Sequence, residues 1–491
     1  MGAAAVLHVT SLLGGGVDRH LRDIARSTPG PHLVWHVGDH AEVLEEPGEG
    51  RYRVLDPARI DADPALISKW LASRSVGIVH AHTLSAKARE RMDAIRPALG
   101  TRTIATLHDV LFLRPDAFAE GAPLEPDPAW LAANSRFLRD AAAVIAPSRF
   151  IADLAQRHIE GVRVEVIPNG GKRAARLPGA APRPEFAEHA PRHVVAVIGA
   201  IGPHKGADTL EALAQELAGS HIAIVVIGYL DRQVVPGWRV PGTFFIHGAY
   251  ADDEVPGLLA AYGARLALFP NRVPESFSYT LSDAWASGLP VLAAPFGALG
   301  ERISRHGGGW LLPPDFDAAT ISARLRELFS TSGAAERARV ESQLSHDDPD
   351  RVPPLASMAR SLAALYDRFG LDARQPTEGD PAALEKLVAT NLDGSLFRAE
   401  LARLADEYGQ EARAHAATNA AARKFEEQTR EWIAKLDRDI AALNAELERE
   451  VAERRRLGEE NAQLAIHKAA FDLLPGVLRK ILLKKILDAR S

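Results

Sequence analysis

The sequence predicts an α/β protein with two domains built on largely parallel sheets, followed by a helical tail. Short apolar runs alternate with segments of helix length in two separate series, a pattern typical of parallel sheets covered by helices. A stretch rich in Pro, Ala and Arg separates the two series and predicts a linker. Beyond residue 371 the composition shifts to Ala, Glu, Arg and Leu in helical register. We therefore expect two Rossmann-like domains that face each other across a cleft.

The first series predicts an N-terminal Rossmann-like domain over residues 1–170. Its strand candidates are AVLHV, HLVWHV, GIVHAH, RTIATLH, AAVIAPS and VRVEVIP. Residues 171–192 are the predicted linker. The second series predicts a C-terminal domain over residues 193–350, with the strand candidates HVVAVIGAIG, HIAIVVIGY, TFFIHGAY, ARLALFP and LPVLAAPFG. Residues 351–370 then predict a helix that returns to the first domain.

Residues 371–470 predict a helical tail, because hardly any strand signal follows residue 380. Over about residues 430–466 a seven-residue repeat favours a parallel two-stranded coiled coil, and hence a homodimer. Its apolar residues are Ile433, Ile440 and Leu447 at one core position and Leu436, Leu443, Leu457 and Leu464 at the other. The alternative is one long amphipathic helix that packs on its own body.

Residues 471–491 predict a basic amphipathic helix. Apolar residues such as Ile481 and Leu482 alternate there with cations such as Lys484 and Lys485. An apolar face beside a cluster of cations suits peripheral contact with an anionic membrane. A terminal helix that caps the coiled coil or docks on the body explains the same pattern equally well.

Charge and composition exclude several classes of protein. The formal net charge is −6, from 58 Lys and Arg against 64 Asp and Glu, so no basic surplus indicates a nucleic-acid partner. The absence of cysteine excludes disulfides, thiolate catalysis and metal sites with sulfur ligands. No apolar run approaches the ~18 residues that span a bilayer, and the start lacks the basic region of a secretory signal. We expect a cytoplasmic protein, with peripheral contact at the inner face of the cell membrane as a further hypothesis.

The first glycine-rich loop follows AVLHVTSLL and contains Gly14, Gly15 and Gly16. Ligands of open parallel sheets bind beyond the carboxyl ends of the strands. Glycines at such a turn let backbone N–H groups approach a phosphate or a sugar. The loop lacks the spacing of a dinucleotide fingerprint or a P-loop, and a tight strand-to-helix connection explains it equally well.

The second domain contains a stronger set of residues. Gly202 and Lys205 lie in the loop between the strand VVAVI and a helix, where an ammonium group can neutralise a diphosphate. Glu275 precedes a predicted helix and Asp283 lies about two turns inside it, so both carboxylates can face one ligand.

The backbone amides of Phe277 and Ser278, at the start of that helix, are free to donate hydrogen bonds. His80 and His82 alternate along a predicted strand and share one face, as metal ligands could. No third ligand follows at a recognisable spacing, so we favour packed or hydrogen-bonded histidines over a metal site.

Seven motifs in this order resemble the family 4 (group 1) glycosyltransferases of the GT-B fold, over about residues 6–369. They are the GGG loop, TLHD, VIAPSRF, VIPNG, IGPHKG, PESFSYTLSDAWASGLPV, and GALGERI followed by GGGWLLPP. The resemblance implies retaining transfer of a hexose from a nucleotide diphosphate sugar, GDP-mannose or another GDP- or UDP-hexose. The acceptor would be a growing cell-envelope polysaccharide or a lipid-linked glycan. It also implies that neither a metal nor a cofactor takes part, since the nucleotide sugar is a substrate.

The resemblance also assigns roles to individual residues. Glu275 would bind hydroxyls of the donor sugar, and Lys205 would stabilise the charge on the leaving diphosphate. His108 would lie near the reacting side of the sugar. The implied donor-binding residues are Gly15, Gly16, Gly202, Phe277, Ser278 and Asp283, with Asp283 at the ribose hydroxyls.

Two positions depart from the family pattern. Asp283 stands where the family has glutamate, which keeps the charge but shortens the reach. Ala200 replaces a common arginine of the phosphate loop, so the diphosphate has one cation fewer. These departures keep open a second hypothesis, a catalytically weakened scaffold that organises a glycan-assembly complex through its coiled coil. A nucleotide-sugar epimerase of the same fold is a third.

Overall fold

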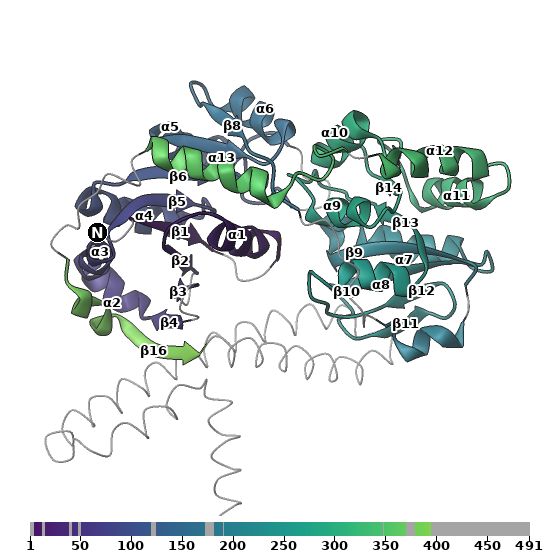
Figure 1. Ribbon diagram of the computed structural model, residues 1–491, viewed down its shortest axis with the longest axis horizontal. Helices are drawn as coiled ribbons and strands as arrows, with labels where there is room; N and C mark the ends of the chain where they lie inside the picture. Colours follow the sequence, from purple (N-terminus) through teal and green to yellow (C-terminus); the bar gives the residue numbers. More distant parts are fainter. Residues whose placement is uncertain are drawn as a thin grey trace, which may run out of the picture.

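The computed structural model describes residues 4–11, 15–38, 42–47, 51–118, 124–171, 181–189, 191–346, 348–369 and 379–393. These residues form two α/β domains, each a sheet with helices on both faces (Figure 1). The two sheets confirm the predicted fold class. All eleven predicted strands form. The coiled coil predicted at 430–466 and the amphipathic helix predicted at 471–491 lie outside the described residues.

The first domain contains eight strands and six α-helices within the described part of residues 4–171. They are β1 (Ala5–Thr10), α1 (Gly15–Ser27), β2 (His32–Val37), β3 (Glu42–Glu46), β4 (Arg51–Leu55), α2 (Pro57–Ala62), α3 (Pro64–Ser73), β5 (Val76–Ala81), α4 (Ala86–Leu99), β6 (Arg102–Thr106), α5 (Pro128–Asp140), β7 (Ala143–Ala146), α6 (Arg149–His158) and β8 (Val164–Val166). A later segment, β16 (Val388–Asp393), joins the same sheet, whose strand order is β16-β4-β3-β2-β1-β5-β6-β7-β8. Pairing is parallel from β2 to β8 and antiparallel from β2 to β16.

The second domain has a seven-stranded sheet in the order β11-β12-β10-β9-β13-β14-β15, parallel except for the pair β11 and β12. Its elements are η1 (Pro184–Glu188), β9 (His193–Ile201), η2 (Pro203–Lys205), α7 (Ala207–Glu216), β10 (Ile222–Leu230), β11 (Gly237–Val240), β12 (Phe244–Ile246), α8 (Val255–Ala261), β13 (Ala264–Phe269), α9 (Tyr279–Ala286), β14 (Val291–Ala293), α10 (Gly297–His306), β15 (Gly309–Leu311), α11 (Ala318–Phe329) and α12 (Ala334–Ser345).

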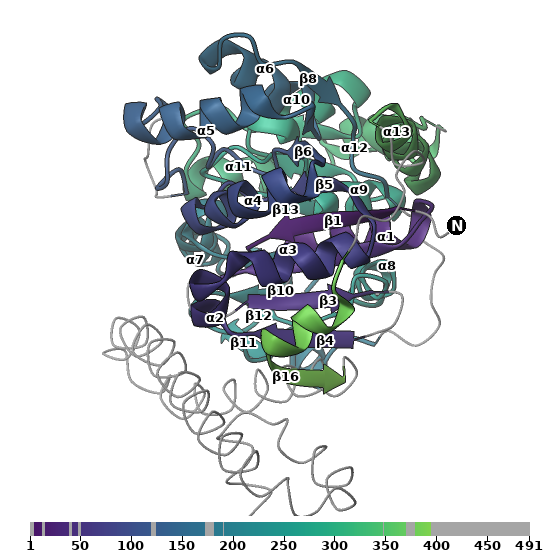
Figure 2. The same cartoon turned by 90° about the vertical axis from the view of Figure 1, so that its left-hand side faces the viewer.

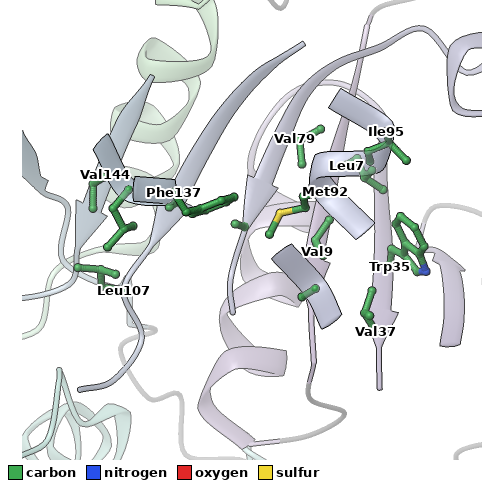
Figure 3. Close-up of a cluster of buried hydrophobic side chains, with 14 of the residues drawn as sticks. Leu7, Val9, Trp35, Val37, Val79, Met92, Ile95, Leu107, Phe137 and Val144 are labelled. Atoms are coloured by element: carbon green, nitrogen blue, oxygen red, sulfur yellow. The ribbon is translucent and has the colours of Figure 1, made fainter. Parts of the chain in front are cut away.

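Alternation along the strands divides each sheet into two apolar faces. In the first domain, Leu7 and Val9 of β1 pack on one face with α4, as Figure 3 shows. Figure 2 shows α2, α3 and α4 side by side on that face. Val6 points to the opposite face, together with Ile24 of α1. The polar side chain of His8 shares this second face, which therefore holds the buried histidines described below.

Helix α13 (Leu355–Arg368) follows the second domain in sequence but packs against the first. Its buried residues Met358, Leu362 and Leu365 join Val6 and other residues of the first sheet in one core cluster. The hydroxyl of Tyr366 lies 2.8 Å from Nδ1 of His80. The helix thus covers the histidine-bearing face of the first sheet.

The expectation of helices alone beyond residue 371 is wrong for the segment that follows the short helix η4 (Pro381–Lys386). Residues Val388–Asp393 form strand β16, which pairs antiparallel with β4 at the edge of the first sheet (Figure 1). The sequence analysis did not predict this strand, because its six residues are surrounded by residues that favour helices. Val388 and Thr390 are β-branched residues, which favour strands.

Ending the chain after Asp393 is expected to leave the first domain stable, whereas ending it after Gly379 should destabilise it. Leu384 and Leu387 of the removed segment are buried, at 2% and 0% exposure, in the core of the first domain. Each buried leucine contributes about 1.5–3 kcal/mol, so we expect a loss of about 3–6 kcal/mol in the free energy of unfolding. Urea unfolding of the two truncated proteins measures it. Both lack the predicted coiled coil, so equal stabilities would contradict the assignment of β16 to this domain.

Candidate active site

Each sheet has a topological switch point, where the strand order reverses, and ligands of such sheets bind at this point. In the first sheet β1 lies between β2 and β5, and in the second β9 lies between β10 and β13. The loop with Gly15 follows β1, the loop with Lys205 follows β9, and Glu275 follows β13. The predicted site residues therefore come from the carboxyl ends of the central strands of both domains.

Gly15 and Gly16 begin helix α1 and approach the second domain. Gly15 has φ +71°, a conformation that favours glycine. A Cβ placed on Gly16 would lie 3.7 Å from the ring of Tyr279 in α9. Gly14, the first glycine of this motif, lies outside the described residues.

Lys205 and Glu275 lie together in the second domain. The distance from Lys205 Nζ to Glu275 Oε1 is 3.5 Å, and Asn271 donates a 2.9 Å hydrogen bond to the same oxygen. The carbonyl of Gly202 accepts a hydrogen bond from the amide of Lys205 and closes the short helix η2. The next residue, Gly206, has φ +85°, and a Cβ there would lie 2.3 Å from the carbonyl oxygen of Pro270, so only glycine fits.

The segment with Phe277 and Ser278 leads into helix α9. Ser278 has φ +67°, unusual for a residue with a Cβ, and its hydroxyl accepts a hydrogen bond from the amide of Leu281. The side chain of Arg302 donates to the carbonyls of Phe277 and Ser278, at 2.8 and 3.0 Å. Arg302 is buried, and this burial lowers its pKa to about 9.

Sequence reasoning missed the role of Arg302, although the residue lies within the quoted motif GALGERI. Its guanidinium also donates to Ser282 and to the carbonyl of Arg351, and it lies over the ring of Phe277 at 4.1 Å. Four hydrogen bonds from one side chain hold the strained turn in place.

His108 connects the two domains. Its backbone carbonyl accepts a hydrogen bond from the hydroxyl of Ser276, the residue after Glu275. His108 is a partly buried residue, and its Nε2 lies 2.9 Å from Nδ1 of His82. The structure thus brings the three predicted catalytic residues, His108, Lys205 and Glu275, to the place where the domains meet.

Asp283 has a partner that the sequence analysis did not consider. Arg19 of α1 donates two hydrogen bonds to its carboxylate, at 2.7 and 2.9 Å, from the other domain. Burial raises the pKa of Asp283, and the hydrogen bonds from Arg19 oppose this rise. Arg19 also lies over the ring of Tyr279 at 4.5 Å. The carboxylate expected at the ribose hydroxyls is therefore part of a contact between domains.

Replacing Arg19 with alanine is expected to open the two domains. The pair is largely buried, with 13% and 11% of the side chains exposed, and removing one partner of such a pair costs about 3–5 kcal/mol. Small-angle scattering should show a larger radius of gyration. Arg22→Ala is the matched control, because the Arg22–Asp252 pair also joins the domains but is exposed and contributes under about 1 kcal/mol. A compact Arg19→Ala variant would contradict the assignment.

Six buried or partly buried histidines form a cluster at the second face of the first sheet: His8, His20, His32, His80, His82 and His108. His80 is hydrogen-bonded to the hydroxyls of Tyr366 and Thr106, and His82 to His8 and His108. The expectation of hydrogen-bonded histidines is confirmed for both. Sequence spacing indicated no third ligand, but the fold brings further histidines beside both residues. The sets His8, His80, His82 and His20, His82, His108 each place one nitrogen per residue within 4.8 Å of the others. The additional histidines lie far away in sequence, so spacing could not indicate them.

None of the helices in the described ranges combines the length and the apolar character needed to span a bilayer. Residues 14–171 match the family model described as Glycosyltransferase Family 4, and residues 182–343 match the one described as Glycosyl transferases group 1. The two matches together cover both domains.

Among curated proteins, the chain is 27% identical over 292 residues to D-inositol 3-phosphate glycosyltransferase of Mycobacteroides abscessus, covering 57% of this chain and 64% of the relative. It is 30% identical over 121 residues to GDP-mannose-dependent alpha-mannosyltransferase of Mycobacterium tuberculosis, covering 24% of this chain and 30% of the relative. The chain thus spans less than two thirds of the length of these curated relatives.

Solved structures share the fold. HepE of Anabaena in complex with UDP and glucose has a TM-score of 0.53 at 18% identity, covering 74% of this chain and all of that one. Sucrose-phosphate synthase of Thermosynechococcus elongatus has a TM-score of 0.55 at 15% identity, covering 74% and 98%. Both family models match in order, and the two Rossmann-like sheets share the fold of these solved structures, so the chain belongs to the family 4, group 1 glycosyltransferases of the GT-B fold.

Proposed function

We propose that this protein is a retaining, metal-independent hexosyltransferase. It takes a hexose from a nucleotide diphosphate sugar, GDP-mannose or another GDP- or UDP-hexose, and adds it to a growing cell-envelope polysaccharide or a lipid-linked glycan. The observation that carries the proposal is the pairing of Lys205 with Glu275 beyond the central strands of the second sheet, beside the start of α9.

The proposed chemistry follows from the charges that develop during transfer. Breaking the bond between sugar and diphosphate leaves positive charge on the sugar and an additional negative charge on the phosphate. Lys205 is the cation for the leaving oxygens, and the amides of Phe277 and Ser278 are the neutral donors. Fixed donors of this kind contribute about 3 kcal/mol each to lowering the barrier. Arg302 binds the carbonyl of Phe277, which shares a peptide plane with the amide of Ser278, and thereby fixes the direction of that amide.

Glu275 is suited to hold the sugar itself. Lys205 and Asn271 both contact Oε1, which leaves Oε2 as an acceptor for sugar hydroxyls. His108 approaches from the first domain, next to Ser276, and we assign it to the reacting side of the sugar. Retention is assigned to front-face attack, in which the leaving phosphate takes the proton of the acceptor hydroxyl. This step rests on the family resemblance.

The proposed nucleotide sugar is supported by different observations from those that support the proposed homodimer and membrane contact. One curated relative is named for GDP-mannose, and one solved structure of the same fold contains UDP and glucose. The proposed homodimer and the peripheral contact with the inner face of the cell membrane rest on the sequences of residues 430–466 and 471–491 alone.

A catalytically weakened scaffold is the second candidate, and the Arg19–Asp283 pair favours it. This pair occupies the carboxylate that the resemblance assigns to the ribose. A nucleotide-sugar epimerase is a third candidate. A donor with a labelled sugar distinguishes the three hypotheses. A transferase moves the label into a larger glycan, a scaffold leaves it in the donor, and an epimerase moves it into an isomerised nucleotide sugar.

The proposal is tested by thermal denaturation with a panel of nucleotide diphosphates and nucleotide sugars in excess EDTA. A ligand at about 100 times its Kd stabilises the native state by about 2.7 kcal/mol, so the matching nucleotide should raise Tm by several degrees. Lys205→Ala should reduce this rise. No stabilisation by any member of the panel, or stabilisation that requires a divalent cation, would count against the proposal.

A further inference from the structure

Four histidines form a continuous hydrogen-bonded chain from the interior of the first domain to its interface with the second. We call His32, His8, His82 and His108, in this order, the histidine chain. His32 Nδ1 lies 3.0 Å from His8 Nε2, His8 Nδ1 lies 3.0 Å from His82 Nε2, and His82 Nδ1 lies 2.9 Å from His108 Nε2. His32, His8 and His82 are buried residues, and His108 is partly buried.

The inner end of the histidine chain has a fixed direction. The hydroxyl of Thr28 donates its single proton to the carbonyl of Ile24 at 2.8 Å, so its oxygen accepts from His32 Nε2 at 3.0 Å. The carbonyl oxygen of Thr28, which can only accept, lies 3.4 Å from the same nitrogen. His32 Nε2 therefore carries a proton.

The direction propagates along the chain because all four rings are neutral. Burial lowers the pKa of His32, and burial together with neighbouring histidines lowers the pKa of His8, His82 and His108 well below the usual value. A neutral imidazole has one donor and one acceptor nitrogen. Each Nδ1 thus accepts from the Nε2–H of the next ring, and the last ring, His108, keeps its proton on Nε2.

We propose that His32, His8 and His82 are positioning residues that hold His108 in its Nε2–H tautomer, with the Nδ1 lone pair available to accept a hydrogen bond from a sugar hydroxyl. The role of His108 toward the sugar rests on the proposed function. The tautomer itself does not, because it follows from contacts within the first domain. Nδ1 of His108 can therefore accept a hydrogen bond, and cannot donate one, before any substrate binds.

A metal ion is the competing occupant of this region. His20 Nε2 is buried and has no hydrogen-bond partner among the residues that the structure describes. One ring nitrogen of His20 lies within 4.8 Å of one ring nitrogen of His82 and one of His108. A metal held there would take the lone pairs of His82 Nδ1 and His108 Nε2 and would replace their 2.9 Å hydrogen bond. Neutral His108 would then carry its proton on Nδ1. The two hypotheses therefore predict opposite tautomers for one residue.

Nitrogen NMR of the full-length protein labelled with ¹⁵N-histidine tests the proposal. His108 signals are assigned by their loss in His108→Gln. In the wild type we expect a protonated Nε2 and an unprotonated Nδ1. His8→Leu removes the acceptor of His82 Nε2–H, so the His108 proton should move in part to Nδ1. His8→Asn retains an acceptor oxygen near the former Nδ1 and should restore the wild-type reading.

His80→Leu is the matched control. His80 is equally buried on the same face, but its nitrogens bind the hydroxyls of Tyr366 and Thr106 and lie outside the histidine chain. The tautomer of His108 should be unchanged in this variant. Once the nucleotide-sugar panel has identified the sugar donor, His8→Leu should lower kcat by about tenfold or more with little change in KM. His8→Asn should recover most of the lost kcat.

Three results would overturn the proposal. They are a protonated Nδ1 on His108 of the wild type, an unchanged tautomer in His8→Leu, or one equivalent of a transition metal in the purified protein whose removal by a chelator moves the His108 proton from Nδ1 to Nε2. If His8→Leu fails to fold, the His108 tautomer in the spectra of the wild type and of His8→Asn tests the proposal. A protein without transferase activity still gives the tautomer, so failure of the proposed function is distinguishable from failure of this inference.

Discussion

Replacing Glu275 with alanine is expected to abolish sugar transfer while the fold remains intact. The carboxylate lies 3.5 Å from the ammonium of Lys205, and one of its oxygens accepts from Asn271. Removing a fixed group that binds the reacting sugar costs about 10²–10³-fold in rate, or about 3–4 kcal/mol in the barrier. Steady-state transfer of labelled hexose measures the loss, and the far-ultraviolet circular dichroism spectrum monitors the fold.

Glu275→Gln separates the charge from the shape of this side chain, because the amide retains an acceptor oxygen but cannot pair with Lys205. We expect it to be nearly as inactive as the alanine variant. Glu341→Ala, at an exposed glutamate of α12 in the same domain, is the control and should transfer normally. Normal turnover by Glu275→Ala would remove its assigned role.

Acid is expected to unfold the first domain well before the carboxylates titrate. Burial lowers the pKa of His20 to about 4, and it lowers the pKa of His8, His80, His82 and His108 well below the usual value. In the unfolded chain each histidine binds a proton near pH 6.5. Below this pH the unfolded state binds more protons than the native state, so the free energy of unfolding falls as pH falls.

The expected size of this effect is large. At pH 5 each such histidine costs about 2 kcal/mol, since the pH is about 1.5 units below the unfolded pKa. Five together approach the whole stability of a typical domain, about 5–15 kcal/mol. Urea unfolding at pH 7.5 and at pH 5 measures the difference. Replacing buried His80 with glutamine should flatten the pH dependence, whereas His346→Gln, at an exposed position, should not. A stability that is equal at the two pH values would contradict the burial of neutral histidines.

Much of the fold could be predicted because its signals are local. The apolar runs that become β1 and β9 are short, buried and bounded by turn residues, so their strand character is evident without the partner strands. The predicted site residues Lys205 and Glu275 follow such strands, and topology alone places them at one edge of the sheet. Strand β16 was missed because its partner, β4, lies more than 300 residues away in sequence and its own six residues carry a weak signal.

The contacts between distant residues could not be predicted in the same way. Arg19 and Asp283 are separated by 264 positions, and nothing in the motif around either residue indicates the other. Arg302 was visible within a motif, but its role depends on burial against Phe277 and Ser278. Asp283 stands where the family has glutamate, and the sequence analysis interpreted this as a shorter reach toward a ribose. In the structure the same carboxylate forms an ion pair with Arg19 of the other domain.

The sequence by itself determined the alternation of strands and helices and the family to which the motifs belong. These properties depend on backbone geometry and on the side chains of near neighbours. Only the tertiary structure decided that His32 of β2, His8 of β1 and His82 after β5 form one hydrogen-bonded chain, and that this chain ends at His108. Desolvation makes those rings neutral and gives each nitrogen a single role, and desolvation arises only when the helices close over the sheet.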